Sequence, residues 1–296
     1  MRVFMTGAAG FIGQATTGEL IANGHQVVGL ARSDANAALI EAMGAEVHRG
    51  SLEDLESLKA GAAKADGVIH LAFIHDFSKY AENGQIDRQA IEAMGDVLEG
   101  TDKPFIVTSG TGLIEPGVTV TEEMRREASP HTPRVSEQAG LAYAARGVRA
   151  MAIRLPQVHG AEGKAGLITY LVELARQNGK AAYVGDGGER WAAAHRADVA
   201  RLYRLALENG KADGIYHAVG EEGVPMREVA EVIGRALKVP TISIKQEEAA
   251  EYYGPLAMFA GLDMPASSAL TQKWLNWTPT GIGLIEDIGQ PGYFAV

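Results

Sequence analysis

Three glycines at three-residue spacing stand near the start of the chain, directly after a short apolar segment. Val3–Thr6 has the composition of a buried strand and Gly13–Asn23 the pattern of a helix, so the glycines occupy the turn between them. We expect Gly7 to make the turn, Gly10 to admit a pyrophosphate and Gly13 to let the helix pack on the strand. The helix N-terminus presents free N–H groups and a positive dipole end to an anion. The motif therefore predicts a phosphate cradle formed by Gly7, Gly10, Phe11, Ile12 and Gly13.

Strand and helix patterns alternate along the first half of the chain. Short β-branched runs predict further strands at Gln26–Leu30, Ala45–His48, Val68–Ala72, Phe105–Thr108 and Ala150–Leu155. Helical patterns lie at Ala35–Met43, from Ser51 onward in a capping-box pattern, near Asp87–Glu99 and at Pro133–Arg146. Strands joined by helical crossovers form a parallel sheet that is covered on both faces. The sequence therefore predicts an α/β fold with a doubly wound parallel sheet.

The second half of the chain is less regular. Helices are expected at Leu167–Gln177, Ala197–Glu208 and from Pro225 to Lys238, and strands at Ala181–Val184, Ile215–Val219 and Thr241–Ile244. Small helices follow toward the C-terminus. Because no low-complexity linker separates the two halves, we expect a lobe packed against the sheet rather than a tethered domain.

The residues after the second predicted strand bear on the choice of cofactor. Sites that bind NAD place an acidic residue here to hold the ribose 2′-hydroxyl. This chain has Arg32 and Ser33 instead, and its first acidic residue is Asp34. A guanidinium and a hydroxyl suit a 2′-phosphate, so NADP(H) is the preferred cofactor and NAD(H) the alternative. Arg32 as an ordinary solvated charge is the other interpretation.

Composition excludes several classes of chemistry. The chain has no cysteine and therefore no disulfide framework, thiolate nucleophile or Cys-ligated metal site. Its eight histidines show no metal-ligand spacing, and a Gly-x-Ser-x-Gly motif is absent, so neither a metal site nor a hydrolase is expected. The net charge of −10 argues against a nucleic-acid partner. Without a signal peptide or an apolar run of membrane-spanning length, a cytoplasmic protein that contacts no membrane is expected.

Several later segments extend the glycine loop into a family resemblance. They are Val68-Ile69-His70-Leu71-Ala72, Phe105-Ile106-Val107-Thr108-Ser109-Gly110-Thr111, Arg154-Leu155-Pro156-Gln157-Val158-His159-Gly160 and His195-Arg196-Ala197-Asp198. In this order the set resembles the extended short-chain dehydrogenase/reductases, the NAD-dependent epimerase/dehydratase-like family. The resemblance covers nearly the whole chain. It implies a Rossmann-type domain over residues 1–156, to which 190–219 return, and a smaller C-terminal substrate lobe mainly over 157–296.

The resemblance also implies roles for individual residues. One of two hydroxyls, Ser109 or Thr111, corresponds to the catalytic Ser/Thr that orients a carbonyl oxygen. The segment from Leu155 to Val158 is expected to line the nicotinamide. A homodimer is a further option that the family implies. The expected cofactor contacts beyond the glycine loop are those of Arg32, Ser33, Ser51, Leu52, Leu71, Ala72, Thr108, Leu155, Pro156 and Val158.

The catalytic signature of this family, Tyr-x-x-x-Lys, is missing. None of the nine tyrosines has a lysine four residues after it. Where the signature is expected, Ser129 and Pro133 occupy the Tyr and Lys positions, and neither can act as the acid and its activating cation. The replacement proton donors that the sequence offers are His159, His131, His75, Asp76 and Tyr143.

These observations lead to two hypotheses. The first is an atypical NADP(H)-dependent oxidoreductase that reduces a carbonyl on a small organic substrate. In it, Ser109 or Thr111 orients the oxygen, and His159 or another local group supplies the proton. The second is a non-catalytic NADP(H)-binding sensor that acts through a partner. The missing signature favours the second, whereas the substrate lobe, with its segment from Trp191 to Asp198, favours the first.

Overall fold

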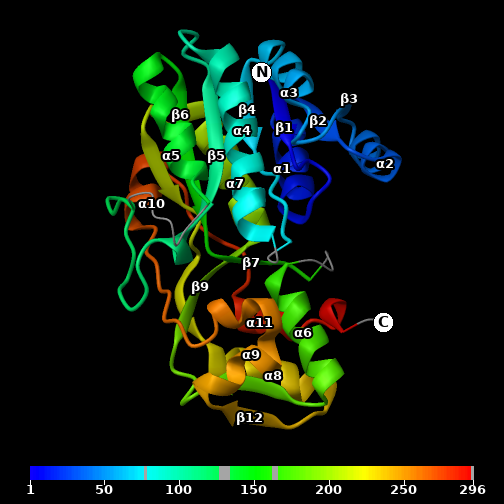
Figure 1. Cartoon of the computed structure of the whole chain (residues 1–296), viewed down its shortest axis with the longest axis vertical. Coiled ribbons are helices and arrows are strands. Elements are labelled where there is room, and N and C mark those ends of the chain that lie inside the picture. Colours follow the sequence, from blue (N-terminus) through cyan, green and yellow to red (C-terminus); the bar gives the residue numbers. More distant parts are fainter. Residues whose placement is uncertain (77–78, 127–133, 162–165, 295–296) are drawn as a thin grey trace.

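The structure is a computed structural model, and it describes residues 1–76, 79–126, 134–161 and 166–294. A seven-stranded parallel sheet forms its upper part, in the strand order β10-β6-β5-β4-β1-β2-β3 (Figure 1). The strands are β1 (Arg2–Thr6), β2 (Gln26–Ala31), β3 (Glu46–Arg49), β4 (Gly67–His70), β5 (Pro104–Gly110), β6 (Arg149–Leu155) and β10 (Gly214–His217). The Rossmann-type doubly wound sheet that the sequence predicts is confirmed.

Helices cover both faces of this sheet. Successive strand residues point to opposite faces, and the residues on each face are apolar. In β1, Val3 and Met5 pack into one core, whereas Phe4 packs into the other. The first core contains α1 (Phe11–Ala22), α2 (Asp34–Ala42) and α7 (Arg196–Asn209). The second contains α3 (Leu55–Ala63), α4 (Tyr80–Leu98) and the 3₁₀ helix η3 (Ala142–Arg146), which continues α5 (Ser136–Leu141).

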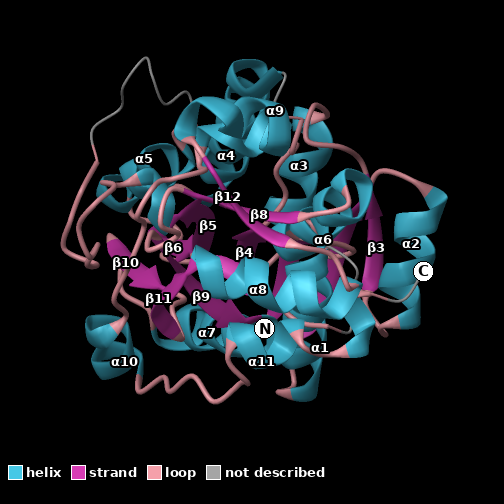
Figure 2. Cartoon of the chain, turned by 90° about the horizontal axis from the view of Figure 1, so that it is seen from below, coloured by secondary structure: helices cyan, strands magenta, loops and turns pink. Residues whose placement is uncertain are grey.

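A second lobe has a hydrophobic core of its own. Its parallel strands β8 (Ala181–Val184) and β12 (Thr241–Ile244) pair directly, and helices pack around them (Figure 2). The helices are α6 (Leu167–Asn178), α8 (Met226–Leu237), α9 (Ala249–Tyr253) and α11 (Leu284–Ile288), with the 3₁₀ helices η4 (Gln246–Glu248), η5 (Gly254–Met258) and η6 (Pro291–Tyr293). The whole of this lobe comes from the C-terminal half of the chain.

A small three-stranded sheet lies between the large sheet and the second lobe (Figure 1). Its strands are β7 (Gln157–His159), β9 (Arg190–His195) and β11 (Glu221–Pro225). Strand β9 pairs parallel with β7 and antiparallel with β11. Within residues 190–219, α7 and β10 therefore rejoin the large sheet, whereas β9 belongs to the small one. The remaining helix, α10 (Ala269–Leu275), packs beside β10 and α7.

Several helices begin or end at other residues than the sequence predicts. The capping box at Ser51 is wrong: α3 starts at Leu55, and the carboxylate of Asp54 accepts the capping hydrogen bond from Ser57 N at 3.1 Å. The first two turns of α4 precede the expected start at Asp87. The helix expected from Pro133 has its first residue outside the described residues, and its last turns are the 3₁₀ helix η3. No helix within the described ranges has the length and hydropathy needed to cross a bilayer.

Candidate active site

The glycine loop between β1 and α1 has the close contacts that its sequence predicts. Gly7 adopts a left-handed backbone with φ of 74°, and a Cβ atom there would lie 2.8 Å from the backbone nitrogen of Ala72. A Cβ on Gly13 would collide with the Gly7 carbonyl oxygen. The backbone of Gly7 therefore lies so close to the backbones of Ala72 and Gly13 that only glycine fits at positions 7 and 13.

The first turn of α1 has the features of an anion-binding site. Its N-cap, Gly10, makes no side-chain cap hydrogen bond, and the turn contains no acidic residue. The first N–H groups of the helix and its positive dipole end are thus left for a ligand. The guanidinium of Arg196, at the start of α7, lies 5.2 Å from the ring of Phe11 and adds a cation beside the loop. The loop fits the pyrophosphate of a dinucleotide cofactor.

The carboxyl end of β2 carries basic groups where an NAD site has an acid. Ala31 ends the strand, and Arg32 after it is exposed. The Ser33 hydroxyl caps α2 by accepting from Asn36 N at 3.2 Å. Arg49 lies in register with Ala31, and its guanidinium donates to Asp34 at 2.8 Å. Sequence reasoning missed Arg49 because only the sheet register brings it to this corner.

Two further segments of the predicted cofactor site follow strands of the large sheet: Leu71 and Ala72 come after β4, and Ser51 and Leu52 come after β3. Ala72 N donates to the Thr6 hydroxyl at 3.1 Å, and Leu71 N donates to the Thr6 carbonyl at 3.3 Å. This pairing holds the chain after β4 against the loop. Ser51 follows β3, where its hydroxyl accepts from Glu53 N at 3.3 Å, and Leu52 packs against the core beneath α3 and α4.

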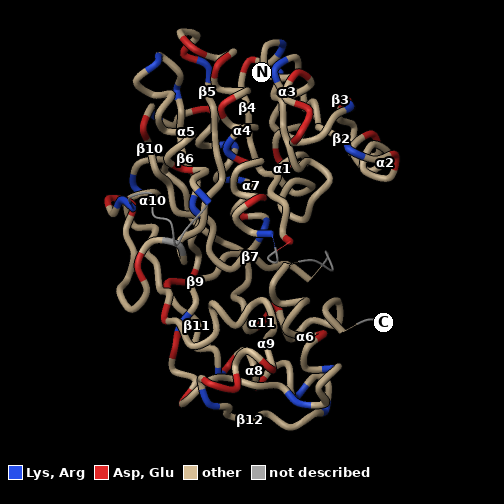
Figure 3. Tube along the Cα trace, in the orientation of Figure 1, with Lys and Arg blue, Asp and Glu red and all other residues tan. Residues whose placement is uncertain are grey.

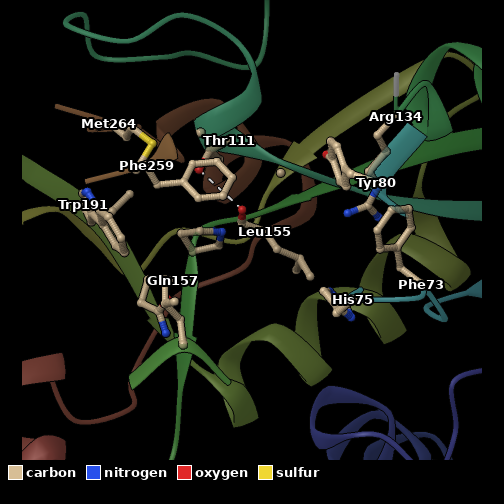
Figure 4. A pocket seen from close by; sticks show the side chains of 15 residues that line it. Phe73, His75, Tyr80, Thr111, Arg134, Leu155, Gln157, Trp191, Phe259 and Met264 are labelled. Atoms are coloured by element: carbon tan, nitrogen blue, oxygen red, sulfur yellow. Dashed lines mark hydrogen bonds between the residues drawn. The ribbon is translucent and has the colours of Figure 1, made fainter. Parts of the chain in front are cut away.

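A cavity of about 220 Å³ opens at the carboxyl ends of the central strands (Figure 4). Two of the predicted cofactor residues, Leu155 and Pro156, line it at the end of β6, and Thr111 lines it after β5. Its other described lining residues are Phe73, His75, Tyr80, Gly110, Gly112, Arg134, Gln157, Leu167, Trp191, Ala192, Phe259 and Met264. The predicted hydroxyl Thr111 and the nicotinamide-lining pair thus share one cavity.

The hydroxyls near the end of β5 have different environments. Thr111 makes a long hydrogen bond of 3.4 Å to the Leu155 carbonyl, and this bond spans the cavity wall in Figure 4. Thr108 is committed to the core, where it donates to the His70 carbonyl at 2.7 Å and lies 2.8 Å from the Tyr203 hydroxyl. Ser109 is 9% exposed and does not line the cavity. Of these three, Thr111 is the hydroxyl that a ligand in the cavity can contact.

Phe73, Tyr80 and Arg134, which the family resemblance does not point to, form one wall of the cavity together with His75. The guanidinium of Arg134 lies 4.0 Å from the centroid of the Phe73 ring, and Tyr80 stands beside it (Figure 4). Burial raises the pKa of Tyr80, although Arg134 acts in the opposite direction. Partial burial and then the charge of Arg134 lower the pKa of His75, so the imidazole is neutral at pH 7.

A buried chain of hydrogen bonds connects this wall to β1. Arg134 Nε donates to the Ser136 hydroxyl at 2.9 Å, which donates to Asp87 Oδ2 at 2.5 Å. On the other side of the carboxylate, His70 Nε2 lies 3.0 Å from Asp87 Oδ1, and His70 Nδ1 lies 2.8 Å from the Thr6 hydroxyl. One buried network therefore joins the cavity to the strand that carries the glycine loop.

The structure does not bring His159 into the cavity. Its side chain is 1% exposed, and Nδ1 lies 2.8 Å from Asp287 Oδ2 in α11. The Tyr293 hydroxyl donates to the same carboxylate oxygen at 2.6 Å. Because β7 continues past Pro156 toward the second lobe, His159 fastens that lobe instead of facing the carboxyl end of β6. Val158 beside it is buried in the first core.

The other proposed proton donors have different positions. Tyr143 is buried, and its hydroxyl donates at 2.8 Å to Asp96 in the last turn of α4. Burial and this bond raise the pKa of Tyr143 to about 12. His131, Ser129 and Pro133 lie outside the described residues. Asp76 is exposed next to His75. The described chain contains no group of three or more His, Cys, Asp or Glu placed to hold a metal ion.

A model of the NAD dependent epimerase/dehydratase family matches residues 3–219, which include the glycine loop, the cavity strands and α7. The chain belongs to the NAD dependent epimerase/dehydratase family. Membership makes it an oxidoreductase or epimerase/dehydratase type of enzyme that uses a nicotinamide cofactor. The glycine loop described above is the feature of this chain that fits such a cofactor.

Relatives of known sequence and structure agree with this family. Uncharacterized protein C2A9.02 of Schizosaccharomyces pombe is 47% identical over 296 residues, covering 99% of this chain and 100% of that protein. A 2-alkyl-3-oxoalkanoate reductase of Stenotrophomonas maltophilia is 27% identical over 264 residues, covering 82% and 77%. The dTDP-glucose 4,6-dehydratase DesIV of Streptomyces venezuelae, solved with NAD, superposes with a TM-score of 0.79 at 19% identity, covering 99% and 97%. The last likeness shows the fold alone.

Proposed function

We propose that the protein is an NADPH-dependent carbonyl reductase for a small organic substrate that binds in the cavity. The observation that carries this proposal is the position of Thr111, Leu155 and Pro156 on one cavity, at the carboxyl ends of strands in the same sheet that carries the glycine loop. In open α/β sheets, ligands bind at the carboxyl ends of the strands. The name of the Stenotrophomonas relative, an oxoalkanoate reductase, supports carbonyl reduction.

The preference for NADPH over NADH is argued from the end of β2. The site lacks the acidic residue that holds a 2′-hydroxyl, and the exposed Arg32 and the register-matched Arg49 are cations suited to a phosphate. The residues proposed to hold the cofactor are Gly7, Gly10, Phe11, Ile12 and Gly13 for the pyrophosphate, with Arg32 and Ser33 for the 2′-phosphate. When bound, NADPH supplies the hydride that the carbonyl carbon receives.

The protein's own residues must hold the carbonyl oxygen and give it a proton. Thr111 lines the cavity, and its hydroxyl can donate to this oxygen in place of its long bond to the Leu155 carbonyl. Tyr80 is the proposed proton donor, because its raised pKa keeps the phenol protonated at neutral pH. Arg134 beside it stabilises the phenolate that remains after transfer.

The direct test measures NADPH consumption by the purified protein with a panel of aryl and alkyl ketones, aldehydes and oxo acids. We expect oxidation of NADPH above the protein-free control for at least one class, and slower oxidation of NADH. Tight NADPH binding without turnover across the panel would overturn the proposal. That result would favour the alternative, a non-catalytic NADP(H) sensor that acts through a partner.

A further inference from the structure

The two ends of the cavity differ in chemistry. Trp191, Phe259 and Met264 form an apolar wall at one end, and Arg134 with Tyr80 and His75 forms the other (Figure 4). Thr111 and Leu155 lie between them. Neither Asp nor Glu is found among the described lining residues, although the chain contains 37 acidic residues. Basic and acidic positions are otherwise interspersed over both lobes (Figure 3).

The guanidinium of Arg134 is held in place from behind. Nε donates to Ser136 at 2.9 Å, Nη2 donates to the Thr108 carbonyl at 3.0 Å, and the plane lies over Phe73. Within the described part of the chain, Nη1 makes no hydrogen bond. An arginine fixed on one side with donors remaining on the other is the usual arrangement for binding a carboxylate, often through two parallel hydrogen bonds.

The positive charge of Arg134 is not cancelled by a direct partner. The nearest carboxylate along its hydrogen bonds, Asp87, is reached only through the Ser136 hydroxyl, and no ion pair joins Arg134 to an acid among the described residues. Asp87 itself already accepts from Ser136 and pairs with His70. His75, the other titratable group with a basic nitrogen on this wall, is neutral at pH 7. An anion at Arg134 therefore meets a guanidinium that has no directly bonded carboxylate among the described residues.

We infer that the substrate is an apolar oxo acid whose carboxylate binds Arg134 and whose hydrocarbon body packs against Trp191, Phe259 and Met264. The carbonyl then lies in the middle of the cavity, beside Thr111. This inference rests on the proposed carbonyl reduction for its reactive group, but the acid-binding role of Arg134 is testable by binding alone. Arg134 is thus assigned as the specificity-determining residue of the cavity.

The test compares 4-phenylbutanoate with its neutral analogue 4-phenylbutanamide by calorimetric titration into the full chain saturated with NADP⁺. The wild type is expected to bind the acid about 10-fold or more tightly than the amide, the value of a charge-assisted hydrogen bond. R134Q should bind both equally, and R134K should recover part of the preference, because lysine keeps the charge but not the fork. The matched control is R88Q on the exposed face of α4, which should retain the full preference.

Two outcomes overturn the inference: equal binding of acid and amide by the wild type, or an unchanged preference in R134Q. An unchanged preference combined with a loss of NADP⁺ affinity in R134Q would assign Arg134 to the cofactor. Reduction is measured separately with 2-oxo-4-phenylbutanoate and its ethyl ester. If the acid preference holds but neither compound nor the wider panel is reduced, the proposed function fails and the acid-binding site stands.

Discussion

The hydroxyl of Ser136 donates a hydrogen bond of 2.5 Å to Oδ2 of Asp87, and neither residue is more than 2% exposed. Burial alone would raise the pKa of Asp87, but the hydrogen bond and charge of His70, the charge of Arg134 and the Ser136 bond together bring this pKa below its ordinary value. Asp87 is therefore a buried carboxylate that stays ionised at neutral pH. Its hydrogen-bond donors offset the unfavourable free energy of burying this charge.

Removing the Ser136 hydroxyl should destabilise the protein and disturb the cavity together. S136A leaves Asp87 Oδ2 buried without a donor, which costs about 1–3 kcal/mol in the free energy of unfolding. Arg134 also loses its Nε partner, so binding of 4-phenylbutanoate should weaken. Chemical denaturation and calorimetry measure the two effects. S243A, at an exposed position in β12 of the other lobe, is the control and should leave acid binding unchanged.

The large sheet and the glycine loop could be read from the sequence because their signals are local. Strand and helix patterns alternate within a few residues. Gly7 and Gly10 lie in the turn between β1 and α1, and Gly13 lies in the first turn of α1. The small sheet could not, because β7 has three residues and β11 begins with two glutamates, so neither shows the alternation of a buried strand. Their pairing with β9 is a tertiary feature.

Two residues of the polar wall, Arg134 and Tyr80, escaped sequence reasoning for a related reason, whereas His75 is one of the proton donors that the sequence offers. Arg134 follows the segment where the Tyr-x-x-x-Lys signature is expected, and Tyr80 has Gly84 instead of a lysine four residues after it. The contact of Ser136 with Asp87 spans 49 residues and depends on the packing of α5 against α4. The sequence predicts His159 near the nicotinamide because its segment follows the strand that ends at Leu155, but after Pro156 the chain enters a different sheet. Sequence spacing alone does not carry this information.

Two glycines of α1 provide a matched test of the phosphate cradle. G13A places a methyl group against the Gly7 carbonyl, so the loop must shift, and NADPH affinity should fall at least about 10-fold as its N–H groups move. Nothing lies within 4 Å of a Cβ atom on Gly18, so G18A should instead raise the free energy of unfolding by about 0.5–1 kcal/mol. Equal NADPH affinity in both variants would contradict a role for the loop in binding.

The charge of Arg32 should distinguish the two cofactors. R32A removes an exposed cation at the end of β2, so NADPH affinity should fall by about 10-fold or more while NADH affinity is unchanged. Fluorescence titration of each reduced cofactor gives the two dissociation constants. R49A is expected to act in the same direction through its place in register with Ala31, and R88A serves as the exposed control. An equal loss for both cofactors in R32A would discard the 2′-phosphate interpretation.

The proton donor can be identified from the pH dependence of kcat. Because burial raises the pKa of Tyr80, a phenol donor keeps the reductive rate level from about pH 6 to 9, below its ordinary value near 10. Because burial and the charge of Arg134 lower the pKa of His75, a histidine donor would instead lose activity with rising pH, at a pH below the ordinary imidazole value of about 6.5. Y80F should lower kcat by about 100-fold or more, whereas H75Q should have little effect. The reverse pattern would move the role to His75.

Buried His217 should set part of the acid sensitivity of folding. Its Nδ1 lies 2.7 Å from the Ser267 carbonyl, and Arg154 Nη1 lies 3.2 Å from Nε2. Burial, followed by the charge of Arg154, lowers the pKa of His217 to about 3. Between that value and the ordinary pKa of about 6.5, the unfolded chain binds a proton that the folded chain does not. The free energy of unfolding therefore falls as the pH is lowered through this window, by up to about 1.4 kcal/mol per pH unit.

H217N removes this titration from both states while an amide keeps one donor for Ser267 and one acceptor for Arg154. The variant should be less stable than the wild type at pH 7, because the smaller amide packs less well, but its unfolding free energy should decline less steeply between pH 6 and 4. Urea denaturation across this range measures both slopes. Parallel slopes would show that His217 is protonated in the folded protein, against the burial and the neighbouring guanidinium that the structure places around it.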